Sequence, residues 1–146
     1  MDIAADLSWN DRYLIGHQAM DDSHQEFVER VNAILRADDR QVPAALHAFV
    51  RHLEAHFAHE EHLMKAFGFP AAECHIEEHQ KVLESVREVH TLVNAGDVEV
   101  ARELAQALAD WFPGHTDYMD SALAAWVVKK VAGGAPVVLR REMQLT

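Results

Sequence analysis

Imidazoles and carboxylates recur along this sequence at intervals that suit a metal site. The seven candidate ligands, in chain order, are His24, His56, Glu60, His75, His79, His115 and Asp120. Two i, i+4 pairs are among them, and on a helix the members of such a pair project from one face about 6 Å apart. Imidazole together with carboxylate suits iron, zinc, copper or nickel better than calcium or magnesium. We therefore predict that these side chains hold two metal ions.

Four helical segments must position these residues, and short polar or Gly/Pro-containing joints separate them. We expect a first helix with its N-cap at 20–23 and its end near residue 36, and further helices at about 43–67, 72–93 and 98–131. Because short joints imply antiparallel neighbours, the predicted fold is an all-α, antiparallel up-down-up-down four-helix bundle. The chain, 1–146, is predicted to be a single domain with its core at 7–131, an irregular N-terminal arm at 1–19 and a C-terminal tail at 132–146.

Glu60 is the candidate ligand that most needs a partner. At about 100° per residue, the apolar residues of the second expected helix lie within an arc of roughly 120° that includes His56, and Glu60 lies near its middle. A buried carboxylate without a partner is very costly in free energy. The other three expected helices also carry candidate ligands on an apolar face. This convergence is a stronger signal than any single histidine, which is more often a surface or core residue.

The spacing between His115 and Asp120 does not fit a regular helix. The two residues are i, i+5, which is about 140° on an ideal α-helix and leaves Asp120 off the buried face. Pro113 and Gly114 come immediately before, and a proline inside a helix removes a backbone hydrogen bond. We therefore predict a distorted turn at 113–120, a kink or a π-bulge, that directs both side chains inward.

Composition and charge exclude several classes of protein. The 146 residues (16.5 kDa) are enough for one domain, and 49% of them are hydrophobic, which is enough for a single core. With 13 basic and 24 acidic residues the net charge is −11, so neither a nucleic acid nor an anionic membrane surface is an expected partner. No apolar run approaches membrane length, and the acidic N-terminus lacks the apolar segment of a signal peptide. Together with the single cysteine, Cys74, these features predict a cytoplasmic protein.

Four segments of the chain together resemble the hemerythrin family, and most closely the bacteriohemerythrins. The segments are Met20-Asp21-Asp22-Ser23-His24, residues 56–64, His75 with His79, and residues 111–120. The resemblance extends over about residues 7–131 and includes Trp9. It is specific because seven candidate ligands occur in the family's order and at the family's intervals. Among the departures, Ser23 stands where the family often has Gln or Glu, and Thr116 stands where Ile is common.

The resemblance implies a non-haem di-iron centre that binds O2 reversibly, for oxygen storage, delivery or sensing. By the resemblance, one iron would be held by His75, His79 and His115 and the other by His24 and His56, with Glu60 and Asp120 bridging them. An oxygen atom from water would form a third bridge, and O2 would bind at the open position of the two-histidine iron. Trp111 and Phe112 are the candidates for lining the O2 pocket. No protein partner is indicated, and a monomer is the working expectation.

Two other functions remain open. A di-iron enzyme acting on peroxide or nitric oxide would use the same metals, but the sequence offers no evident acid or base beyond the ligands. Bundle-type di-iron oxygenases use four carboxylates and two histidines, and a set with fewer anionic ligands stabilises high-valent iron less well. A histidine phosphotransfer bundle needs an exposed histidine near lysine and glycine, whereas the nearest match, His79 with Lys81, is expected to face the core. We therefore expect a binding protein that is not an enzyme.

Overall fold

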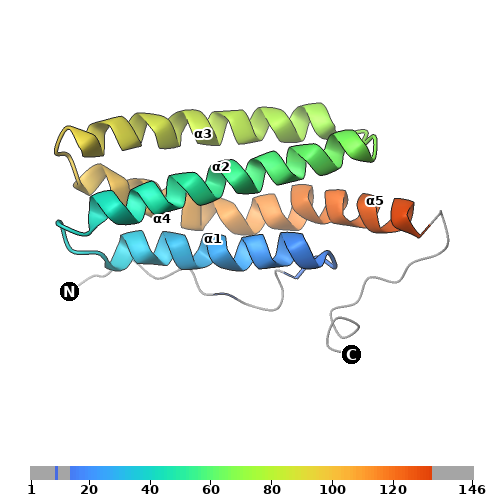
Figure 1. Cartoon of the computed structure of the whole chain (residues 1–146), viewed down its shortest axis with the longest axis horizontal. Helices are drawn as coiled ribbons and strands as arrows, with labels where there is room; N and C mark the ends of the chain where they lie inside the picture. The colour runs from blue at the N-terminus through green and yellow to red at the C-terminus, as the bar shows by residue number, and fades with distance from the viewer. Residues whose placement is uncertain (1–8, 10–13, 133–146) are drawn as a thin grey trace.

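The chain forms four antiparallel rods (Figure 1). The computed structural model describes residue 9 and residues 14–132, so the outer parts of the predicted arm and tail lie outside the described residues. The first three rods are α1 (Gln18–Arg36), α2 (Val42–Ala66) and α3 (Ala72–Asn94), and the fourth consists of α4 (Glu99–His115), a π-helical turn η2 (Thr116–Asp120) and α5 (Ser121–Val131). Contacts join α1 to α2, α2 to α3, α3 to α4 and α4 back to α1. The predicted all-α, up-down-up-down bundle is confirmed, and the described residues contain no strand.

The start of α1 differs from the prediction. Its N-cap is His17, whose Nδ1 accepts a hydrogen bond of 3.3 Å from the backbone N–H of Met20. The predicted N-cap at 20–23 is therefore wrong, because an imidazole nitrogen takes the place of the usual side-chain oxygen. Asp21 instead accepts a hydrogen bond of 2.9 Å from the backbone N–H of Ile15, which secures the segment that leads into the helix.

The interior has a polar layer between two apolar clusters. The larger cluster includes four phenylalanines, Phe27, Phe49, Phe57 and Phe112. The smaller cluster includes Met20, Leu63, Met64, Leu123 and Val127. On α1, His24 lies between Met20 of the smaller cluster and Phe27 of the larger one, and the polar residues of the other rods are buried at the same level. The two clusters therefore lie on either side of the polar layer along the bundle axis and separate it from the solvent at both ends.

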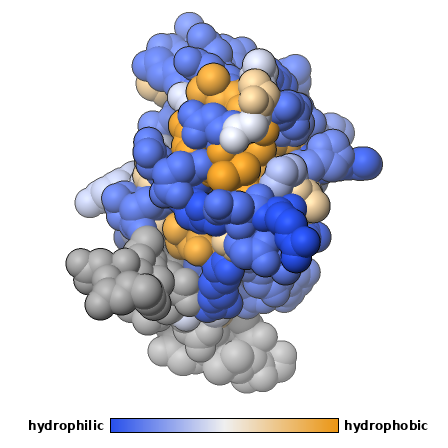
Figure 2. Space-filling model, turned by 90° about the vertical axis from the view of Figure 1, so that its left-hand side faces the viewer, coloured by the Kyte–Doolittle hydropathy of each residue, from blue (hydrophilic) through white to orange (hydrophobic). Residues whose placement is uncertain are grey.

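The larger cluster reaches the surface at one end of the bundle. Figure 2 views the end at which α1 joins α2 and α3 joins α4, and shows apolar side chains in its middle with hydrophilic ones around them. Half-buried side chains from these two joints, including Ala37 and Val98, pack against the cluster. Within the described part of the chain, no helix combines the length and the apolar character needed to cross a membrane.

Candidate metal centre

A π-helical turn places the last two candidate ligands. The predicted distortion at 113–120 is confirmed, since α4 continues through Pro113 to His115 and is followed by η2. A π-helix closes its hydrogen bonds over five residues instead of four, so residues five apart come to lie on one side of the rod. Asp120 is accordingly 1% exposed, and its Oδ1 lies 3.1 Å from Nε2 of His115.

All seven predicted ligands meet in the polar layer. The candidate ligand atoms of Glu60, His75, His79, His115 and Asp120 lie within 4.8 Å of one another, and those of His24, His56 and Glu60 form a second such group. None of the seven side chains is more than 5% exposed. Each of the four rods contributes at least one of them. The structure therefore brings together every residue that the spacing singled out.

Glu60 lies between the two groups of histidines. Its Oε2 is 2.7 Å from Nε2 of His56 and 3.3 Å from Nε2 of His24. Its Oε1 is 3.1 Å from Nε2 of His79 and 3.4 Å from Nε2 of His75. One oxygen of this carboxylate thus lies beside the two-histidine group, and the other lies beside the three-histidine group.

Asp120 divides its oxygens in the same way. Its Oδ2 is 3.0 Å from Nε2 of His24, whereas its Oδ1 is 2.9 Å from Nε2 of His75. The same Oδ1 faces Nε2 of His115. Two carboxylates that each present one oxygen to either group have the arrangement expected of ligands shared between two cations.

The two buried carboxylates are ionised and favour positive charge close to them. Burial opposes ionisation of Glu60, but the adjacent histidines outweigh it and hold the pKa of Glu60 well below its ordinary value. Burial and the charge of Glu60 oppose ionisation of Asp120, yet the adjacent His115 and His24 lower its pKa as well. In return, although burial disfavours charged His24, hydrogen bonds and charge from Asp120 and Glu60 raise its pKa to about 10. The centre therefore favours cations between two fixed negative charges.

The unpaired atoms of the centre fit metal ions. Buried atoms without a hydrogen-bond partner among the described residues include Nε2 of His75, His79 and His115, Oε1 of Glu60 and Oδ1 of Asp120. Buried polar atoms are normally paired, because an unpaired one costs free energy. Cations held by these nitrogens and oxygens would satisfy all of them, and the donor set of imidazoles and carboxylates is one that iron and zinc accept.

Two residues of the site were missed by sequence reasoning. Glu78 on α3 accepts a hydrogen bond from Nδ1–H of His115, which leaves Nε2 of His115 facing the centre. His52 on α2 packs its ring against His56, at 5.5 Å between centroids, and its Nε2 lies 3.1 Å from the backbone oxygen of Ser23. Glu78 lies between His75 and His79 in the sequence, but this position alone is only a weak indication of a role in the site. Its partner, however, is on another helix, so no spacing along the chain identifies the contact.

We expect Glu78→Gln to weaken metal binding by roughly tenfold, because a carboxylate behind a ligating histidine fixes the ring and increases its basicity. Iron affinity would be measured by competition with a ferrous chelator. Glu77→Gln is the matched control, since the exposed Glu77 pairs only with Lys81 on the surface, at 3.8 Å, in the interactions that we describe. Equal affinity of the Glu78→Gln variant and the parent protein would show that Glu78 does not support the centre.

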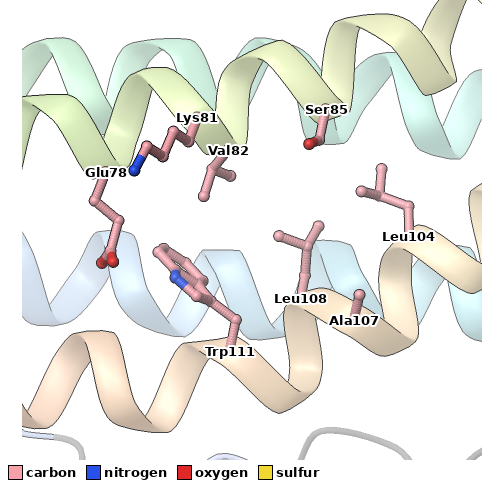
Figure 3. A pocket seen from close by; sticks show the side chains of 8 residues that line it. All are labelled: Glu78, Lys81, Val82, Ser85, Leu104, Ala107, Leu108 and Trp111. Atoms are coloured by element: carbon pink, nitrogen blue, oxygen red, sulfur yellow. The ribbon is translucent and has the colours of Figure 1, made fainter.

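The two predicted pocket residues border different groups of histidines. Phe112 is buried with its ring edge-on to His24, at 5.7 Å between centroids. Trp111 stacks on His115 at 4.3 Å and lines a pocket of about 320 Å3 between α3 and α4, where Glu78 lies at the same end (Figure 3). Adjacent residues on a helix point about 100° apart. Phe112 therefore borders the two-histidine group, and Trp111 borders the three-histidine group.

The fold and the centre together define a four-helix-bundle protein with a buried cluster of imidazoles and carboxylates that could hold metal ions. The family model of the hemerythrin HHE cation binding domain matches residues 16–127. This chain belongs to the hemerythrin family.

Relatives and solved structures agree with this assignment. The chain is 36% identical to the bacteriohemerythrin of Ralstonia nicotianae over 124 residues, which cover 85% of this chain and 90% of that protein. It is 30% identical to the bacteriohemerythrin of Stenotrophomonas maltophilia over 122 residues, 81% of this chain and 79% of that one. Crystal structures of two hemerythrin mutants match with a TM-score of 0.75 at 21% identity, covering 82% of this chain and 95% of theirs. The predicted resemblance is confirmed.

Proposed function

We propose that this chain is a non-haem di-iron protein that binds O2 reversibly without turning it over, for oxygen storage, delivery or sensing. The observation that carries the proposal is the division of the oxygens of Glu60 and Asp120 between a three-histidine and a two-histidine group. A site for a single metal ion does not require two carboxylates that each present one oxygen to two separate groups of histidines. The cation-binding description of the family and the bacteriohemerythrin names of the relatives support the same reading.

The roles of the ligands follow from their grouping. In the proposal, His75, His79 and His115 would hold one iron, His24 and His56 would hold the other, and Glu60 and Asp120 would each give one oxygen to either iron. When bound, a pair of ferrous ions supplies the reversible two-electron chemistry that holding O2 requires. Two histidines leave fewer protein ligands on the His24 side, so we assign the O2 position to that side.

The surrounding side chains exclude water from the His24 side. Phe112 packs edge-on against His24, and Phe27 stacks on Phe112 at 4.8 Å between centroids. Phe27 also contacts the ring of His56, at 6.4 Å. The exposed fractions of the two phenylalanines are 1% for Phe27 and 2% for Phe112. An apolar wall of this kind limits the entry of water and protons, which favours release of intact O2 over its reduction.

The proposal is tested by anaerobic reconstitution of the full chain with ferrous iron, followed by exposure to air and then to argon. We expect two irons per chain and a visible absorption band that appears in air and is lost under argon. Irreversible bleaching or steady consumption of O2 would contradict the proposal. Rapid turnover of added hydrogen peroxide or nitric oxide by the iron-loaded protein would indicate the enzymatic alternative instead.

A further inference from the structure

Thr116 has a buried hydroxyl group that nothing else in the fold explains. The residue is 0% exposed, and its Oγ1 has no hydrogen-bond partner among the described residues. Hydroxyls in helices usually bond to the carbonyl four residues earlier. Thr91 does so with Arg87, at 3.1 Å, and Ser121 does so with Asp117, at 2.5 Å. Thr116 makes no such bond, although leaving a buried hydroxyl unpaired costs free energy.

The position of Thr116 on the fourth rod places it beside the two-histidine group. Thr116 follows Phe112 by one regular helical turn, with its backbone N–H bonded to the carbonyl oxygen of Phe112, and Asp120 follows Thr116 across η2. Phe112 contacts the ring of His24, and Asp120 Oδ2 lies 3.0 Å from Nε2 of His24. The residues one turn before and one turn after Thr116 thus both contact the same imidazole. This places Thr116 on the part of the rod that faces His24.

The chemistry of that position favours a hydrogen-bond donor. A ligand held on the His24 side lies against Phe112 and Phe27, neither of which offers a polar group to its outer atom. A threonine hydroxyl rotates freely and can donate one hydrogen bond. A donor in an apolar surrounding is stronger than the same donor in water, because no solvent competes with it.

We propose that Thr116 donates a hydrogen bond from Oγ1 to the small acceptor ligand held on the His24 side, O2 in the ferrous protein and an anion such as azide in the ferric protein. This inference rests on the proposed function and adds a specificity-determining residue to it. The donor strengthens the binding of ligands that carry negative charge on the outer atom. It also explains why the fold tolerates an unpaired hydroxyl in its interior.

The test compares the parent protein with Thr116→Val, which has nearly the same shape but lacks the hydroxyl, and with Thr116→Ser, which retains it. Azide would be titrated into each iron-loaded ferric protein and followed by its absorption band. We expect Thr116→Val to weaken azide binding by roughly three- to tenfold, the effect of one hydrogen bond, and Thr116→Ser to restore most of it. Thr91→Val is the control, because Thr91 is exposed and bonds only to its own helix in the interactions described.

A second measurement does not depend on bound metal. Because Thr116 Oγ1 is unpaired, Thr116→Val should leave the stability of the chelator-treated protein unchanged or increase it. A marked loss of stability in that variant would show that the hydroxyl has a partner in the fold and would overturn the inference. Equal azide affinities in the parent and Thr116→Val would overturn it while leaving the di-iron proposal intact. An iron-loaded parent that binds neither azide nor O2 would overturn both.

Discussion

Glu60→Gln is expected to abolish binding of the iron pair. Both oxygens of Glu60 face imidazoles, at 2.7 Å from His56 and 3.1 Å from His79, one on each side of the centre. A neutral amide has one acceptor oxygen and one amino group, so it cannot serve both sides. We expect iron content to fall from two ions per chain to one or none. The stabilisation by iron, about 4 kcal/mol when free iron exceeds its Kd a thousandfold, should be lost with it.

Iron content would be measured after reconstitution and gel filtration, and unfolding would be followed by circular dichroism with and without iron. Glu54→Gln is the matched control, since Glu54 is an exposed residue of the same helix whose described interaction is a surface ion pair with Arg87, at 3.4 Å. The control should hold two irons and keep its iron-dependent stabilisation. Full occupancy in Glu60→Gln would disprove the bridging role of Glu60.

Deletion of Tyr118 is expected to weaken metal binding without lowering the stability of the metal-free protein. Around η2 the buried positions are 112, 115, 116, 120, 123, 124 and 127. The two candidate ligands His115 and Asp120 are five residues apart, one more than the spacing of a regular helix allows, and the π-helical turn accommodates the extra residue. The turn therefore amounts to one inserted residue, and Tyr118, at 81% exposure, can be removed without losing a core contact.

We expect the deletion variant to form a regular α-helix and, without metal, to unfold at the same or a higher denaturant concentration than the parent. Its Asp120 is displaced along the rod by about 1.5 Å, so the iron pair should bind at least roughly tenfold more weakly. Tyr118→Ala is the control, because it removes the same exposed side chain and keeps the π-helical turn. A deletion variant that holds two irons at parental affinity would show that the turn has no role in the site.

The elements and the meeting of the seven candidate ligands were predictable because each has a local cause. Pro43 in the opening turn of α2 and Gly68 after its end mark the helix in the sequence itself. The mismatch between His115 and Asp120 predicted a distortion where the structure has η2. A pattern along one chain was enough in each case.

Contacts between helices, and which atom of a side chain makes a given hydrogen bond, were not predictable in this way. His17 caps α1 through a ring nitrogen, a use of histidine that cap preferences do not indicate. The contact between Glu78 and His115 depends on how α3 and α4 are rotated against each other. The unpaired state of the Thr116 hydroxyl depends on every neighbour that could have bonded to it. None of these features leaves a periodic signal in the sequence.

The distribution of the candidate ligands over all four rods has a consequence for how long the proposed iron pair would stay in the protein. Since no ligand is more than 5% exposed, a chelator cannot reach the ions at the surface and must await an opening that separates at least two rods. Iron residence time should then follow the opening rate of the bundle. A truncation far from the ions, such as Leu46→Ala in the larger apolar cluster, should therefore accelerate iron release in proportion to the stability it removes.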